Sequence, residues 1–255
     1  HQGVGALPLP ADVTAVIARQ YELEAWVYPL VRSYLPPETM LPHDISLLAG
    51  DVAAYVPFAD VVEVPCGPQS AAALWQLIVN KLYAAGLTNL SAGRLAGIQL
   101  PLATARQQKV SRVADLNFSL LLMIWAEGVP TYVATHGQPL RRNGIDALSW
   151  QQRGRTSPAF MDLGDILRSD DTPRMRWDQL VRLDESEHVF ALVGAHMAGR
   201  IERAGGIGAL VQAISRGPRG FYDAFMNLDP GALVSFELAP EPPAEEPRLP
   251  LRVTH

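Results

Sequence analysis

The spacing of apolar residues along the chain predicts a mainly helical protein. After an extended stretch at residues 6–10, Asp12 can cap a helix with apolar residues at helical spacing, and Pro29 bends or ends it. That apolar face consists of Val13, Val16, Ile17 and Tyr21. A second helix is predicted from Ser70 to Ala85, with Gly86 as its stop signal.

The stretch from Lys109 to Trp125 begins amphipathic and becomes apolar on every side, which is typical of a helix that enters a core. Glu127 lies at the end of this predicted helix. Asp184 and Glu187 have the spacing of a capping box, which predicts a helix that continues to about Arg203 and stops at the following glycines. Two shorter helices are predicted at residues 207–215 and 218–227, the second beginning with a proline.

Two short segments rich in β-branched or small residues, 53–56 and 60–64, are bounded by prolines and predict strands that could form one hairpin. Residues 138–157 are predicted to form surface loops. The sequence from 240 to 255 is too rich in proline and acidic residues to belong to a core. The expected architecture is one mainly α domain over residues 1–239, with a small β-hairpin or few short strands, followed by a Pro/Glu-rich tail at 240–255.

Composition restricts the classes of partner. Of the 255 residues, 48% are hydrophobic and 18% charged, a balance typical of a globular chain rather than a disordered one. The net charge of −5, without a dense stripe of lysine and arginine, argues against nucleic acid as a partner. The longest strongly apolar run, Leu120 to Ala126, is far shorter than the roughly 20 residues that a membrane-spanning helix needs. No membrane span is expected, and the remaining partner class is a peptide or a protein.

Cys66 is the only cysteine, so the chain can form neither an internal disulfide nor a zinc site built from several cysteines. A lone thiol is usually inert unless a positive group lowers its pKa. The chain begins at His1 rather than methionine and holds no readable signal peptide, so both a cytoplasmic and a processed extracytoplasmic location stay open.

Two stretches resemble a known group of enzymes. The segment from Trp125 to Val133, WAEGVPTYV, resembles the W-x-E-G-x-A-x-Y-x segment of gluzincin-type zinc metallopeptidases. The segment from Gly194 to Glu202, GAHMAGRIE, with the glycines and the Gly-Pro-Arg-Gly-Phe sequence that follow it, is similar to the closing helices of a bacterial family described as zinc-dependent peptidases. The likeness spans roughly 90 residues with gaps. It implies a zincin-like helical domain in which Glu127 corresponds to the third metal ligand.

The motif that would complete such a site, H-E-x-x-H, is absent from the sequence. It places two histidines one helical turn apart on one metal and a water-activating glutamate between them. No histidine occurs between His43 and His136, and no two of the six histidines are three or four residues apart. In the order of the family, the motif belongs on the helix predicted from Ser70. There Trp75, Gln76 and Val79 occupy the places of the first histidine, the glutamate and the second histidine.

Glu127 therefore has two interpretations. It is either the remnant of a metal site, or a ligand in a rewired one, or else a carboxylate that pairs with an arginine or caps a backbone group at the end of an apolar helix. The second interpretation is simpler. Pro130, where the family has alanine, is a further departure from the pattern.

The histidines offer few other candidates for metal ligands or catalytic residues. His188 and His196 are eight residues apart, about 12 Å along one helix, which makes them poor ligands of a common metal. The D-x-x-E-H sequence that ends at His188 resembles the inverted zinc motif H-x-x-E-H, but helix capping explains it more simply. His196, among small residues, is interpreted as a hydrogen-bonded core histidine or as a site residue. His43 has no identifiable nucleophile near it, and the common serine-hydrolase and nucleotide-binding motifs are missing.

The sequence leads to the hypothesis of a catalytically inactive zinc-peptidase-like protein with a binding or structural role. Under this hypothesis no residue is assigned as catalytic or as a metal ligand, and no cofactor is expected. Zinc is expected only if the site is rewired. The candidate remnant site consists of Glu127, Trp75, Gln76, Val79 and His196. One alternative is a metal-dependent hydrolase with a rewired site around Glu127, which predicts that His136, His188 or His196 converges on it. Another is an unrelated helical interaction protein, favoured if the helices of Glu127 and Gly194 lie apart.

Overall fold

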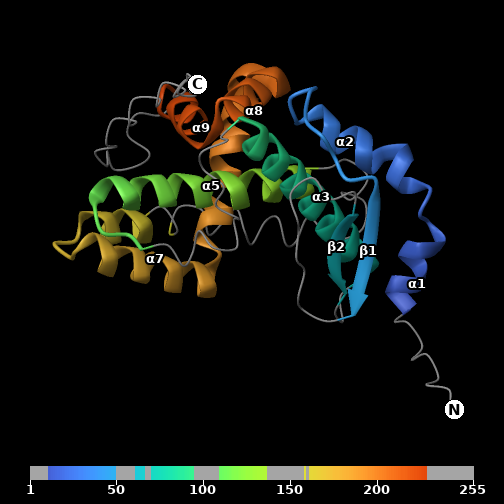
Figure 1. Cartoon of the computed structure of the whole chain (residues 1–255), viewed down its shortest axis with the longest axis horizontal. Coiled ribbons are helices and arrows are strands. Elements are labelled where there is room, and N and C mark those ends of the chain that lie inside the picture. The colour runs from blue at the N-terminus through green and yellow to red at the C-terminus, as the bar shows by residue number, and fades with distance from the viewer. Residues whose placement is uncertain are drawn as a thin grey trace, which may run out of the picture.

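The computed structural model of the chain describes residues 11–49, 61–66, 70–94, 109–136, 158 and 161–228, without the side chains of residues 49, 91–94 and 136. These residues are mainly helical, with one small sheet, so the predicted fold class is confirmed. In Figure 1, α5 runs across the middle of the molecule and α8 crosses it, while α3, the sheet and the N-terminal helices lie at one end and α7 at the other. The predicted tail at 240–255 lies outside the described residues.

The predicted first helix is divided into three pieces: α1 (Ala11–Ala18), the π-helix η1 (Leu23–Val27) and α2 (Tyr28–Ser33). Pro29 sits in the first turn of α2. A proline has no N–H to donate, and its ring would collide with the carbonyl four residues earlier in a continuous α-helix. The preceding turn widens instead, and the Tyr28 N–H bonds to the Leu23 carbonyl five residues back.

The sheet consists of two parallel strands, β1 (Asp44–Ala49) and β2 (Val61–Cys66), paired in register from Asp44 with Val61 to Ala49 with Cys66. The predicted second strand exists, but its described partner is β1, and the pairing is parallel rather than that of a hairpin. The predicted strand at 53–56 lies outside the described residues. His43 lies in a bend directly before β1, and Asp44 is the first residue of that strand.

Three long helices build the core: α3 (Ala71–Arg94), α5 (Val113–His136) and α8 (Val189–Ser215). α3 does not stop at Gly86, contrary to the prediction. A Cβ at Gly86 would lie 2.6 Å from Leu35 Cδ1 and 2.8 Å from Leu41 Cδ2, so this glycine serves close packing and not helix termination. α5 likewise runs past Trp125 and passes through the buried Pro130.

Within α5, residues Val113–Thr135 are long and apolar enough to cross a membrane by length and composition. However, 72% of the most apolar window is buried by the rest of the protein. An all-round apolar helix covered in this way is a core helix of a folded domain. Within the described residues, no other helix meets the same test of length and composition.

The predicted capping box at Asp184 and Glu187 is not formed. Asp184 lies in the last turn of α7 (Pro173–Glu187), a helix that the apolar pattern did not predict, and Glu187 is exposed at its end. The buried Asp184 carboxylate accepts a hydrogen bond from the Phe190 N–H at 2.9 Å. It therefore still provides an acceptor for a backbone N–H in the first turn of α8. Between the two helices, His188 adopts a left-handed conformation with φ 53°.

α8 breaks at Gly206, where φ is 75° and ψ is 179°. The predicted stop at this point and the short helix after it are therefore confirmed. α9 (Gly217–Met226) follows, with a proline in its first turn as predicted, and packs against both α8 and α5.

Candidate remnant site around Glu127

The positions that correspond to the missing metal-binding motif lie on α3, and two of their side chains are buried. Trp75 is 3% exposed and Val79 is fully buried, while Gln76 is partly buried. The indole of Trp75 packs against that of Trp26 from η1, with ring centroids 5.7 Å apart and planes tilted by 53°. The place predicted for the first histidine is thus filled by an indole held in an aromatic pair.

Glu127 lies within α5 rather than at its end, and it is partly buried. Its carbonyl accepts a hydrogen bond from Thr131 Oγ1 at 2.7 Å. The same hydroxyl is 3.5 Å from Nδ2 of Asn80, which is on α3. α3 and α5 therefore meet within one turn of Glu127, and the sequence positions that were paired in the prediction belong to neighbouring helices.

On the other side, α5 meets α8 through two glycines. A Cβ at Gly128 would lie 2.2 Å from Gly194 Cα, and a Cβ at Gly194 would lie 2.0 Å from the Ile124 carbonyl oxygen. No side chain fits between these backbones. The two stretches on which the peptidase resemblance rests are consequently in direct contact at Gly128 and Gly194.

A second contact between the same two stretches was not predicted. Glu202 of α8 accepts a hydrogen bond from Tyr34 Oη at 3.1 Å and is also hydrogen-bonded to Tyr132 of α5. Burial, with the hydrogen bond to Glu202, raises the pKa of Tyr132 well above its ordinary value. Gly199 makes room for this ring, since a Cβ there would lie 3.0 Å from Tyr132 Cε2. Tyr34 is 168 positions from Glu202, a separation that no local pattern reveals.

His196 does not point to a metal site in the part of the chain that is described. It lies on α8, two residues after Gly194, and its ring meets Phe225 of α9 edge-on with centroids 6.2 Å apart. His188 is exposed at the junction of α7 and α8. The backbone of His136 ends α5, and its side chain lies outside the description. Among the described residues, no group of three His, Cys, Asp or Glu side chains is arranged to hold a metal ion.

Three donor atoms near the predicted motif are buried. Trp75 Nε1, Gln76 Nε2 and Trp125 Nε1 are buried without an acceptor among the described residues. An indole N–H and an amide NH₂ have no lone pair to offer to a metal ion. These three atoms can donate only to acceptors, while the amide oxygen of Gln76 and the carboxylate of Glu127 carry lone pairs.

Cys66, at the end of β2, is partly buried, and its Sγ lies 3.7 Å from the Val64 carbonyl oxygen. Burial raises the pKa of the thiol. Since the thiolate is the reactive form, this environment makes Cys66 a weaker nucleophile than a free cysteine.

Comparison of the chain with profiles of known protein families, with curated proteins and with solved structures finds no match.

Proposed function

We propose that the chain is a zinc-peptidase-like helical domain without peptidase activity, which serves a binding or structural role toward a peptide or protein. The observation that carries the proposal is which side chains occupy the positions on α3 that correspond to the missing motif. A catalytic zinc site needs three protein ligands and an open fourth position for water. Trp75 and Val79 offer no lone pair to a metal, and Trp75 is packed against Trp26.

The arrangement of the helices supports the relation to zinc peptidases. The stretch that resembles the ligand-bearing segment, on α5, touches the stretch that resembles the closing helices, on α8, at Gly128 and Gly194. α3 reaches the same region of α5 through Asn80 and Thr131. The alternative of an unrelated helical interaction protein is favoured if the helices of Glu127 and Gly194 lie apart, and because they lie in contact we favour the degenerate peptidase.

A hydrolase with a rewired site would need new ligands near Glu127. His196 is engaged with Phe225, and His188 is exposed at the start of α8. The described side chains therefore favour the inactive form over the rewired one.

Metal analysis after equilibrium dialysis against zinc, together with hydrolysis of a general protein substrate, tests the proposal. The full chain should retain less than one zinc per molecule, and replacing Glu127 by alanine should change neither metal content nor hydrolysis. Glu185→Ala, at an exposed position of α7, is the matched control. One zinc per chain, with hydrolysis lost in Glu127→Ala and kept in Glu185→Ala, would overturn the proposal.

A further inference from the structure

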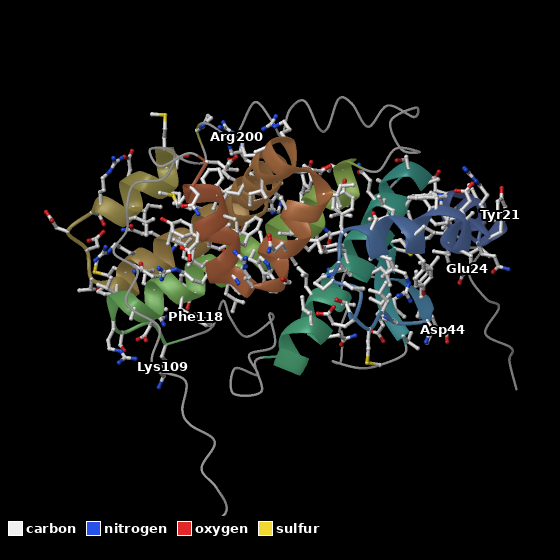
Figure 2. The ribbon with its side chains drawn as sticks, turned by 90° about the horizontal axis from the view of Figure 1, so that it is seen from above. Tyr21, Glu24, Asp44, Lys109, Phe118 and Arg200 are labelled. Carbon is white, nitrogen blue, oxygen red and sulfur yellow. The ribbon has the colours of Figure 1, made fainter. Side chains whose placement is uncertain are left out.

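An apolar surface lies on α1 and the turn that follows it. Ile17 and Tyr21 are 45% and 65% exposed and lie four residues apart. The charged side chains Glu24, from η1, and Asp44, from the start of β1, are exposed as well. Figure 2 shows Tyr21, Glu24 and Asp44 at the same end of the molecule.

This end of the protein is acidic. Residues 11–49 contain five acidic and two basic side chains, whereas the whole chain has a net charge of −5. The acidic residues are Asp12, Glu22, Glu24, Glu38 and Asp44, and the basic ones are Arg19 and Arg32. Arg19 is paired with Glu22, which offsets both charges, and Arg19 is also hydrogen-bonded to the side chain of Tyr21.

Glu24 and Asp44 act on a common neighbour. Burial raises the pKa of Tyr28 to about 12, and the negative charges of Glu24 and Asp44 add to this effect while Arg32 opposes it. Two carboxylates from separate elements thus contribute to one local negative field around Tyr28.

We propose that the surface formed by Ile17, Tyr21, Glu24 and Asp44 is a docking site for a basic amphipathic segment of a partner protein. The partner's apolar side chain covers Ile17 and Tyr21, and its lysines or arginines meet the two carboxylates. An aromatic anchor beside complementary charges is the usual composition of an energetically important contact. This inference does not depend on the relation to zinc peptidases.

Charge selects this occupant over the others. A second copy of the chain would bring the same acidic surface against itself across a symmetric interface, where like charges repel. An anionic membrane surface would be repelled for the same reason. A cationic segment is the occupant that both the apolar pair and the carboxylates favour.

Selection from a displayed library of random 12-residue peptides on the immobilised full chain tests the proposal. Enriched peptides should combine aromatic or aliphatic residues with lysine or arginine, and their affinity should fall as salt is raised. Binding of a selected peptide, measured by fluorescence anisotropy, should weaken about tenfold or more in Tyr21→Ser and in Glu24→Lys. Both side chains are exposed, so circular dichroism should show an unchanged fold.

The matched controls lie at the opposite end of the protein. Met161→Ser removes an apolar side chain that is 64% exposed, close to the value for Tyr21, and Asp165→Lys reverses an exposed charge. Neither should alter peptide binding. The proposal is wrong if no peptide is enriched, if enriched peptides lack basic residues, or if the controls weaken binding as much as the two test variants. Self-association that is lost in Tyr21→Ser, seen by sedimentation, would also overturn it in favour of a second copy.

Discussion

The close contact between α5 and α8 predicts that Gly128→Ala and Gly194→Ala each destabilise the protein. The added Cβ at position 128 would lie 2.2 Å from Gly194 Cα, and that at 194 would lie 2.0 Å from the Ile124 carbonyl oxygen. Non-bonded carbon atoms prefer separations of about 3.5–4.0 Å, so the helix backbones would have to move apart by more than about 1 Å. Rotating a side chain cannot relieve the collision, because both partners belong to the backbone.

A gap of about 1 Å forfeits a quarter to a half of the dispersion energy of the contacts it opens, and forced overpacking typically costs about 1–3 kcal/mol or more. Alanine regains up to about 1 kcal/mol of helix propensity relative to glycine. Because α5 and α8 form the most extensive helix pair among the described residues, the overpacking cost should lie at the upper end of this range, and we expect each variant to lose about 2 kcal/mol or more of unfolding free energy.

Urea denaturation followed by far-ultraviolet circular dichroism measures this loss. Gly208→Ala is the matched control, since Gly208 is exposed in the part of α8 that follows the break at Gly206, with open space around the position of its Cβ and no positive φ. It should stabilise the protein by about 0.5–1 kcal/mol. If Gly128→Ala or Gly194→Ala proved neutral or stabilising like the control, the close crossing of the two helices would be refuted.

Three further predictions concern other parts of the structure. Gly206→Ala should lower the unfolding free energy by about 1–3 kcal/mol in the same assay, because its φ of 75° and ψ of 179° suit glycine alone; a stabilising effect would contradict the break in α8. Asp184→Ala should cost about 1–3 kcal/mol by leaving the Phe190 N–H without its acceptor, whereas Asp178→Ala, at a surface ion pair, should change stability by less than about 1 kcal/mol. Equal effects would argue against the buried cap. Burial raises the pKa of Tyr28 to about 12 in the folded protein, above the ordinary value of about 10 that it has in the unfolded chain. The protonated Tyr28 side chain therefore contributes its full stabilisation of the fold below about pH 10, and this stabilisation is lost as the pH rises from about 10 to about 12. Tyr28→Phe should reduce the fall in unfolding free energy over this interval, and an unchanged pH profile would contradict the reasoning.

The helix that overlaps α8 was predicted from a capping box that does not form, and α9 from the proline at its start. The apolar pattern located α3 and α5, whose buried side chains the sequence displays directly. It failed at Gly86, since a glycine that ends a helix and a glycine that admits a neighbouring side chain look the same until Leu35 and Leu41 are in place. It also failed for α7, whose surface is largely polar and whose core contacts rest on few residues, among them Trp177.

The sheet and the candidate site show a different limit. Parallel pairing joins strands that are not linked by a tight turn, so nothing local to β2 identifies β1 as its partner. Trp75 was singled out from the order of motifs, but its packing against Trp26 depends on a segment 49 residues earlier. Tyr34 and Glu202 are further apart still. These contacts are products of tertiary folding, and only their residue types are visible in the sequence.

Restoring the missing motif is the direct test of whether α3 and α5 preserve the frame of a zinc peptidase. The motif H-E-x-x-H is restored on α3 by the three substitutions Trp75→His, Gln76→Glu and Val79→His. We expect this variant to bind one zinc per chain, detected by titration calorimetry and by a zinc-dependent rise in Tm. Adding Glu127→Ala should weaken zinc binding by about tenfold or more, or about 1.4 kcal/mol.

The control pair Leu77→His and Lys81→His has the same spacing but lies about 200° around α3, so any zinc it binds should be insensitive to Glu127. The predicted result is zinc binding by the restored variant that depends on Glu127. A restored variant that keeps its helical circular dichroism but binds zinc no better than the control pair, or that binds equally well without Glu127, would contradict the claim that α3 and α5 preserve the frame of a zinc peptidase.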